Sequence, residues 1–181
     1  MPRLFAALRP PPEIRDSLRA VMTGVSAARW QSDAQLHLTL RYLGEVDAGT
    51  AQDVTTALAA VCARPITVQL AGVGAFERRG RVDTLWVGLT PHDALRRLHH
   101  AVDRALAAVV AWPAARTFVP HITVARLAHG AKVADEIAQW QRFHAAVAST
   151  AFDFTHVSLF ESELAPGGAE YREVSRRPLQ D

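Results

Sequence analysis

His37-Leu38-Thr39-Leu40 and His121-Ile122-Thr123-Val124 are the two stretches of this 181-residue sequence that decide its fold. Each alternates polar and apolar residues, the period-2 pattern of a β-strand with one buried face. Residues i and i+2 of a strand share a face, so each stretch places a histidine beside a threonine and turns its apolar residues towards a core. Roughly 0.13 matches to His-apolar-Thr-apolar are expected by chance in such a composition, and two are found.

Strand and helix patterns alternate through the rest of the chain. Proline marks several boundaries, and Thr90-Pro91 is expected to begin a helix as its N-cap and first residue. A histidine-bearing strand in each half of the series suggests two similar α+β lobes packed together. Periodicity predicts strands over 3–8, 36–43, 66–70, 84–89, 119–127, 152–160 and 171–174, and helices over 14–25, 47–63, 95–109 and 131–143.

Composition is that of an ordinary globular protein, with 49% hydrophobic and 21% charged residues. A chain of this length buries a core without disulfide or metal, so we expect one domain over 1–181, possessing two packed lobes. No apolar run approaches the roughly 20 residues that a bilayer requires, and the apolar stretch at 4–8 is too short for a signal peptide. We therefore expect a cytoplasmic monomer without a membrane partner. The one cysteine, Cys62, excludes an internal disulfide and a cysteine-rich zinc site.

Charge is nearly balanced, with 20 basic and 18 acidic residues. The basic residues are nevertheless unusual, because Lys132 is the one lysine and all the others are arginine. Arginine is suited to bidentate phosphate recognition, although a GC-rich genome produces the same bias without functional meaning. The charge pattern thus permits a phosphate-bearing ligand and does not require one.

The two histidines are the candidate catalytic residues. Histidine gives or takes protons near neutrality, so His37 and His121 facing one ligand can act as acid and base in a displacement at phosphorus. The hydroxyls of Thr39 and Thr123 can donate to phosphate oxygens, and Arg126, near the same strand end, can add a bidentate contact. The structural alternative is that both pairs face solvent and only pair across a sheet.

Four stretches together resemble the 2H phosphoesterase superfamily, and within it the bacterial and archaeal RNA 2′,3′-cyclic phosphodiesterases, also called 2′-5′ RNA ligases. The two His-x-Thr-x tetrapeptides are the motifs of that superfamily. Leu43-Gly44 after the first tetrapeptide and Phe118-Val119-Pro120 before the second favour this branch. The resemblance extends over nearly the whole chain, through residues 3–8, 36–44, 85–88 and 116–126.

This resemblance implies a bilobal α+β fold, with two pseudo-symmetric antiparallel sheets lining a central cleft and helices packed outside. It also implies opening of a ribose 2′,3′-cyclic phosphate to a 2′-phosphate without metal or cofactor, and RNA ends or nucleotides as partners. His37 would protonate the departing O3′ and His121 would activate water, although pseudo-symmetry leaves an exchange of these roles open. Thr39, Thr123 and Arg126 would bind phosphate. Tyr42 would stack on the nucleobase, with Arg41 a weaker candidate beside it.

Other function classes stay open at this point. A binding protein would hold RNA ends without turnover, and ligation would use the same four His and Thr residues. A metallohydrolase needs three or four ligands near one ion, and only Asp33 and Glu45 lie near the motifs in sequence. The arginines of the turn at 78–81 either grip an RNA backbone or are ordinary surface residues.

Three further residues are assigned to ordinary structural roles. Trp86, in the middle of a predicted strand, is expected in the core. His99 and His100 point about 100° apart on a helix and do not form a chelating pair, so a solvated helix face is expected there.

Overall fold

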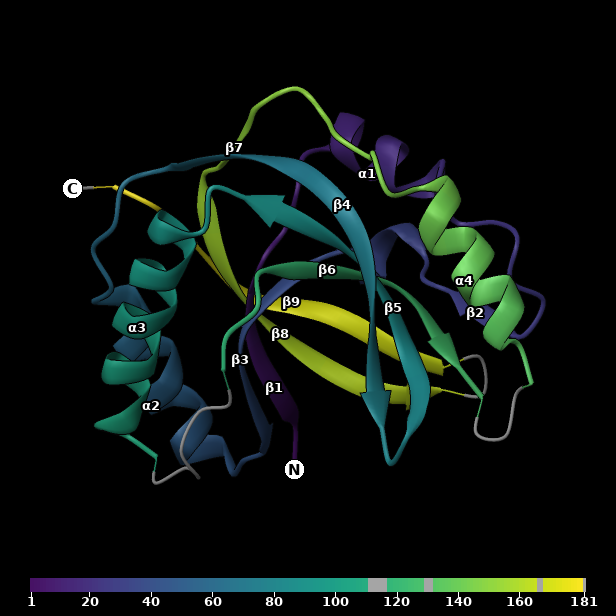
Figure 1. Ribbon diagram of the computed structural model, residues 1–181. Helices are drawn as coiled ribbons and strands as arrows, with labels where there is room; N and C mark the ends of the chain where they lie inside the picture. Colours follow the sequence, from purple (N-terminus) through teal and green to yellow (C-terminus); the bar gives the residue numbers. More distant parts are fainter. Residues whose placement is uncertain (111–116, 129–131, 166–167, 181) are drawn as a thin grey trace.

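The computed structural model describes residues 1–110, 117–128, 132–165 and 168–180 (Figure 1). Within these ranges the chain forms an α+β fold whose elements alternate along the sequence as predicted. The strands are β1 (Arg3–Leu8), β2 (Ala28–Trp30), β3 (Leu38–Glu45), β4 (Ile66–Arg78), β5 (Arg81–Thr90), β6 (His121–Leu127), β7 (Phe152–Phe154), β8 (His156–Ala165) and β9 (Gly168–Pro178). The α-helices are α1 (Pro12–Arg19), α2 (Ala48–Ala59), α3 (Asp93–Ala107) and α4 (Ala134–Phe143), and a 3-10 turn, η1 (Asp33–Gln35), precedes β3.

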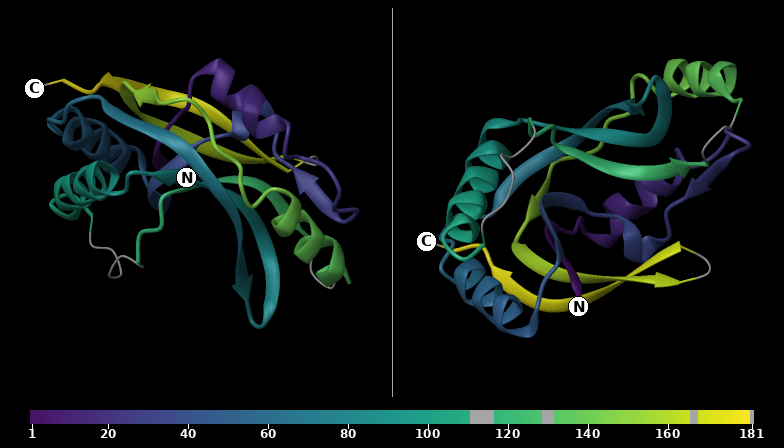
Figure 2. Two further views of the ribbon diagram at one scale, coloured as in Figure 1. Left: turned by 45° about the horizontal axis from the view of Figure 1, so that its top comes forward. Right: turned by 90° about the horizontal axis from the view of Figure 1, so that it is seen from below.

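The strands form two antiparallel sheets, as the resemblance to the 2H phosphoesterases implies. The four-stranded sheet has the order β3-β1-β8-β9, and the five-stranded sheet has the order β2-β6-β5-β4-β7. The right-hand view of Figure 2 shows the two sheets one over the other, with α2 and α3 side by side at one end of the molecule. The four-stranded sheet combines the first strand of the chain with the last two, so the two lobes are not simply the two halves of the sequence.

The apolar residues that alternate with the polar ones in the two motifs lie in the hydrophobic core. Leu38 and Leu40 of the first motif, and Ile122 and Val124 of the second, are all buried. Helices contribute their apolar stripes to the same cluster, which explains why these amphipathic segments form helices here although propensity alone is weak. The buried stripe residues are Ile14, Leu18, Val54, Leu58, Leu95, Leu98, Val102, Leu106, Ile137 and Trp140.

Several boundaries differ from the prediction. The expected strand over 152–160 is two strands that separate at Thr155, because β7 pairs with β4 in one sheet and β8 pairs with β1 in the other. Helix α3 begins at Asp93 rather than at Pro91, since Thr90 still belongs to β5 and lies opposite Gln69. Helix α1 ends at Arg19, and the predicted start of the fourth helix at 131 lies outside the described residues.

The β4–β5 hairpin is longer than its apolar patterns suggest. Both strands continue to the turn at Arg79-Gly80, where both residues have positive φ, 54° and 73°. Positive φ at both central positions is the geometry of a tight hairpin turn that matches the twist of its strands, and glycine adopts it freely.

No helix among the described residues is long and apolar enough to cross a membrane.

Candidate active site

The first motif is fixed by hydrogen bonds on both sides of its imidazole ring. His37 lies one residue before β3, between η1 and the strand. Its Nδ1 is 2.7 Å from the carbonyl oxygen of Gln35, and its Nε2 is 3.1 Å from Oγ1 of Thr39. A carbonyl oxygen only accepts, so Nδ1 carries the proton in the neutral ring and Nε2 accepts from the threonine hydroxyl. The predicted pairing of a histidine with a threonine two residues later is confirmed for this motif.

Aromatic rings surround the imidazole of His37. Its ring centroid is 4.8 Å from that of Phe5, 5.3 Å from that of Tyr171 and 6.2 Å from that of Phe160. These rings come from β1, β8 and β9, the three other strands of the four-stranded sheet that contains β3. Desolvation by this environment lowers the pKa of His37 from 6.5 to about 4, although the Gln35 carbonyl favours the protonated ring. His37 is therefore neutral at pH 7.

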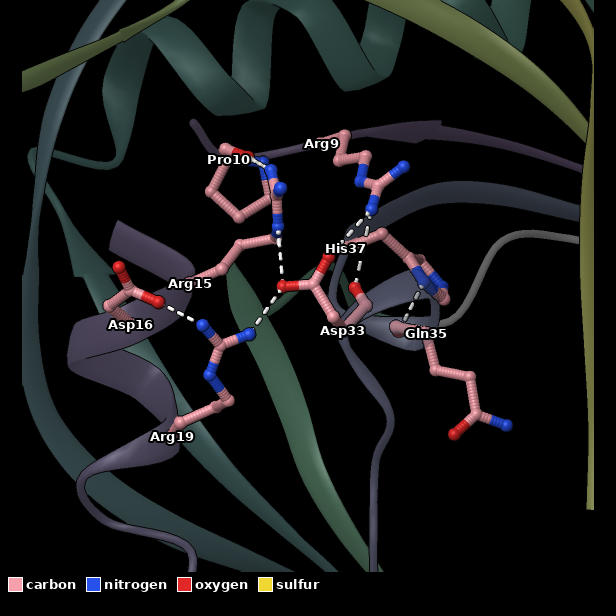
Figure 3. Close-up of polar contacts among 8 residues, drawn as sticks. All are labelled: Arg9, Pro10, Arg15, Asp16, Arg19, Asp33, Gln35 and His37. Atoms are coloured by element: carbon pink, nitrogen blue, oxygen red, sulfur yellow. Dashed lines mark hydrogen bonds and ion pairs between the residues drawn. The ribbon is translucent and has the colours of Figure 1, made fainter. Parts of the chain in front are cut away.

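Asp33 anchors the segment that leads into His37 (Figure 3). Its carboxylate accepts from Arg15 at 2.9 Å and from Arg19 at 2.7 Å on one oxygen, and from Arg9 at 3.1 Å on the other. The hydrogen bond from Arg15 and the charges of all three arginines lower the pKa of Asp33. This ion-pair cluster attaches η1 to α1 and to the end of β1, so it fixes the position from which His37 projects.

The two carboxylates considered as metal ligands are both engaged by arginine. Asp33 is bound by the three arginines just described, and Glu45 accepts a 2.9 Å hydrogen bond from Arg3. Within the described ranges, no three side chains of His, Cys, Asp or Glu gather closely enough to hold a metal ion.

The second motif repeats the backbone contact of the first histidine. His121 begins β6, and its Nδ1 is 2.6 Å from the carbonyl oxygen of Val119, two residues earlier, as in the His37–Gln35 contact. Phe76 meets the ring edge to face at 4.7 Å, and Trp86 lies at 6.0 Å. Burial lowers the pKa of His121, and the nearby charge of Arg126 lowers it further. His121 is thus also neutral at pH 7, with Nε2 unprotonated.

The faces that carry the two motifs are turned towards each other. Strands β3 and β6, one from each sheet, are in contact. The positive charges of Arg126 and of protonated His121, both on β6, also lower the pKa of His37. Arg126 acts in the same way on Tyr171 of β9, whose pKa burial raises. The two histidines therefore belong to one electrostatic environment.

A β-bulge brings Arg126 onto the face of His121 and Thr123. Arg126 follows Thr123 by three residues, and strict alternation would turn it to the opposite face. In the β5–β6 register, Thr123 lies opposite Trp86 and Ala125 opposite Leu85, so β6 carries one extra residue between them. The extra residue restores Arg126 to the motif face. There its guanidinium donates to Oγ1 of Thr84 at 2.6 Å.

A matching bulge in β3 separates Tyr42 from Arg41. Thr39 lies opposite Ala7 and Arg41 opposite Ala6, so Leu40 is the extra residue. Tyr42, which then lies opposite Phe5, shares the face of Thr39 and is 59% exposed. The fifth residue after each motif histidine is thus an exposed side chain on the motif face.

Arg41, the weaker candidate for the nucleobase site, has a different environment from Tyr42. The bulge turns Arg41 to the opposite face of β3, where it forms an ion pair with Asp103 of α3 at 3.3 Å. Arg41 is therefore directed into the packing between β3 and α3.

Two of the ordinary structural roles expected above are wrong. Trp86 is half-buried and packs beside His121 rather than in the core. His99 is 5% exposed, not solvated, because its ring stacks on Phe118 at 4.2 Å and its Nε2 lies 3.7 Å from Asp103. The sequence carried no signal for the Phe118 contact of His99, or for the rings of Phe5, Phe76, Phe160 and Tyr171 around the two histidines, because these contacts join separate segments of the chain.

Gly74 sets the position of the indole beside His121. A Cβ atom on Gly74 would overlap the six-membered ring of Trp86. Gly74→Ala is therefore expected to displace the indole, to shift the NMR resonances of His121, and to lower the free energy of unfolding by about 1–3 kcal/mol. Urea unfolding and the imidazole spectrum measure both effects.

Gly49→Ala is the matched control for that substitution. Gly49 lies in the first turn of α2, where a Cβ atom would be 3.3 Å from the Asp47 side chain. The control is expected to change the free energy of unfolding by no more than about 1 kcal/mol. If Gly74→Ala behaved like Gly49→Ala, Gly74 would not determine the position of Trp86.

Comparison with known proteins gives one consistent family. Residues 10–165 match the family described as the 2′-5′ RNA ligase superfamily. An RNA 2′,3′-cyclic phosphodiesterase of Aeropyrum pernix is 31% identical over 160 residues, which cover 88% of this chain and 89% of that protein. One from Archaeoglobus fulgidus is 27% identical over 95% of this chain and 97% of its own length.

Solved structures agree with this assignment. A protein of Thermus thermophilus superimposes with a TM-score of 0.82 at 26% identity, over 98% of both chains. The LigT protein of E. coli in complex with 3′-AMP superimposes with a TM-score of 0.80 at 26% identity, over 100% of both chains.

Proposed function

Since the chain belongs to the 2′-5′ RNA ligase superfamily, we propose that it hydrolyses RNA 2′,3′-cyclic phosphate ends to 2′-phosphates. Its relatives in Aeropyrum pernix and Archaeoglobus fulgidus bear the name of that activity. The observation that carries the proposal is the repeated geometry of the two histidines. Each donates Nδ1–H to the carbonyl of the residue two positions earlier. Each therefore keeps Nε2 for proton exchange with a substrate.

The reaction needs one proton acceptor and one proton donor on opposite sides of phosphorus. In the hydrolytic direction, Nε2 of His121 takes a proton from water, and the water oxygen forms a bond to phosphorus. The bond from phosphorus to O3′ breaks, and Nε2–H of His37 supplies the proton that O3′ requires. The products are a 2′-phosphate and a free 3′-hydroxyl. The pseudo-symmetric site permits the exchanged assignment, and a 5′-hydroxyl replacing water in the same step gives a 2′-5′ linkage.

Hydroxyl and guanidinium groups on the motif faces stabilise the phosphate in this proposal. Thr39 and Thr123 donate to its non-bridging oxygens, where negative charge increases in the transition state. Arg126 lies on the same face as Thr123 because of the bulge in β6, and its guanidinium can bind two oxygens at once. The exposed ring of Tyr42 offers a surface on which a base can stack.

The protonation of His37 is coupled to substrate binding. With a pKa of about 4, the ring is neutral in the free protein at pH 7 and cannot act as an acid. A bound phosphodiester anion beside Nε2 favours the imidazolium form and raises this pKa. Substrate binding thus favours protonation of His37, which then donates this proton to the leaving O3′.

We further propose that residues 1–181 act as one bilobal domain and need no metal ion. Pairing of β1 with β8 ties the start of the chain to its end, which supports one folding unit. The arginine contacts of Asp33 and Glu45 leave neither carboxylate beside the histidines as a spare ligand, which supports metal-independent chemistry.

The decisive experiment uses a short RNA that ends in a 2′,3′-cyclic phosphate, incubated with the protein in excess EDTA. We expect complete opening to a 2′-phosphate, identified by resistance to a 3′-specific phosphatase together with removal by a nonspecific phosphatase. A 3′-phosphate product would contradict the proposed regiochemistry, and loss of turnover in EDTA would contradict metal independence. Binding of the RNA without any turnover would instead indicate a protein that holds or ligates RNA ends.

A further inference from the structure

The tip of the β4–β5 hairpin carries three exposed arginines: Arg78, Arg79 and Arg81. The tip extends beyond the rest of the chain in the left-hand view of Figure 2. Arg78 and Arg81 lie directly opposite each other as the last cross-strand pair before the turn. None of the three guanidinium groups has an ion pair or a hydrogen bond within the described ranges. The hairpin therefore ends in positive charge that the rest of the described chain leaves uncompensated.

A bulge decides which face of the hairpin carries the opposed arginines. Phe76 lies opposite Thr84, whereas Glu77 lies opposite Val82, so Asp83 is an extra residue in β5. In β4 the alternation is unbroken, which places Arg78 on the same face as Phe76, the ring that contacts His121. Arg81, opposite Arg78, joins it on this face. Glu77 lies on the other face, together with Val82, which packs against the core.

The opposed arginine pair has an energetic cost within the protein alone. Like charges directly across a strand pair are destabilising, and neither arginine forms an ion pair with a carboxylate of the described residues. Glu77 is on the other face, and the carboxylate of Asp83 accepts a 2.8 Å hydrogen bond from the hydroxyl of its neighbour Thr84. An anion bound between the two guanidinium groups would turn this repulsion into attraction, with bidentate hydrogen bonds from each.

The five-stranded sheet orders the phosphate-binding groups along one direction. Along β5, His121 lies opposite Gly88, Thr123 opposite Trp86 and Arg126 opposite Thr84. Arg81 follows three residues beyond Thr84, about 10 Å further along the strand. The ring of Phe76, opposite Thr84, lies between the histidine and the tip. Such a sequence of cationic and aromatic groups on one face suits a single-stranded polynucleotide.

We propose that Arg78 and Arg81 bind a backbone phosphate of the RNA upstream of its cyclic end, so that oligoribonucleotides are preferred over cyclic mononucleotides. This inference rests on the proposed function, since it assigns the substrate class of the same site. Arg79, at the turn itself, adds to the positive potential without belonging to the opposed pair.

The test compares two substrates of the intact protein: a 2′,3′-cyclic mononucleotide and an oligoribonucleotide with a 2′,3′-cyclic phosphate end. In the double variant Arg78→Gln/Arg81→Gln, kcat/KM for the oligonucleotide is expected to fall about tenfold or more, while that for the mononucleotide stays unchanged. Binding of the 2′-phosphate oligonucleotide product should also depend less on salt. The slope of log affinity against log salt concentration should decrease in magnitude by about 1 to 2. Equal losses for both substrates, or none for either, would overturn the inference.

The matched control is Arg176→Gln/Arg177→Gln. These two exposed arginines lie near the end of β9 by the C-terminus, away from the hairpin tip (Figure 1). The control is expected to keep both kcat/KM values and the wild-type salt slope. A failure of the proposed function is distinguishable, because the wild-type protein would then turn over neither substrate. In that case product binding decides the inference, and an unchanged affinity and salt slope in the hairpin variant would refute it.

Discussion

Replacing His37 or His121 with alanine is expected to lower kcat for a 2′,3′-cyclic phosphate end by a factor of about 10² to 10⁴ each. Each substitution removes the group that accepts or donates a proton at Nε2, and no other described histidine has a ring contact or hydrogen bond with either motif. Single-turnover rates at saturating substrate measure the chemical step directly. Because the two rings act as a pair, the double variant should be little slower than the slower single variant.

A graded series separates proton transfer from phosphate binding. Thr39→Val keeps the shape of the side chain and removes a donor to the phosphate, at a cost of about 2 kcal/mol or roughly thirtyfold in rate. His100→Ala is the matched control, since His100 is exposed on α3. The control should keep the wild-type rate. A His37→Ala variant that kept its turnover within threefold of wild type would refute paired-histidine catalysis, provided that its unfolding transition is intact.

The His-Thr pairs are the part of the site that local sequence determines. A strand shows residues i and i+2 on one face whatever its partners are, and the 3.1 Å contact between His37 and Thr39 follows directly from that spacing. The double occurrence of the motif then suggested two similar α+β lobes, and the family resemblance implied two sheets. The core residues between the polar positions followed from the same alternation, and they are buried as predicted.

The bulges are the part that local sequence does not contain. An extra residue at Leu40 exists only because β1 pairs with β3 in that register, and the extra residue before Ala125 exists only because of β5. Without these registers, the sequence does not indicate which of Arg41 and Tyr42 lies on the motif face. In the structure one is bound to Asp103 and the other lies on the motif face.

Long-range strand pairing also explains why the sequence did not predict the aromatic rings around His37. The rings of Phe160 and Tyr171 reach it from β8 and β9, more than a hundred residues later in the chain. The break at Thr155 has the same origin, because an apolar alternating run does not reveal that its two halves enter different sheets. Desolvation of the histidine, which sets its pKa, therefore follows from the tertiary fold.

Acidification is expected to destabilise the protein through His37 well before its carboxylates are protonated. The pKa of this ring is about 4 in the folded protein and 6.5 in the unfolded chain, so below pH 6.5 the unfolded chain binds the proton first. The stability contributed by the neutral, partly buried ring is fully present above pH 6.5 and is lost as the pH falls towards 4. The loss from this one group amounts to about 2 kcal/mol at pH 5 and at most about 3 kcal/mol at pH 4.

Urea unfolding between pH 7 and pH 4 measures this loss, and His37→Gln isolates it. The variant should show a smaller difference in free energy of unfolding between pH 7 and pH 5, by about 2 kcal/mol, whereas His100→Gln should keep the wild-type difference. Burial also lowers the pKa values of His99, His121 and His144, so part of the acid sensitivity should survive in the variant. Inorganic phosphate should reduce the His37 part, because an anion at Nε2 raises the folded-state pKa towards 6.5. An unchanged pH dependence in His37→Gln would mean that the aromatic surroundings do not hold this ring neutral, and the coupling of its proton to phosphate binding would fail with it.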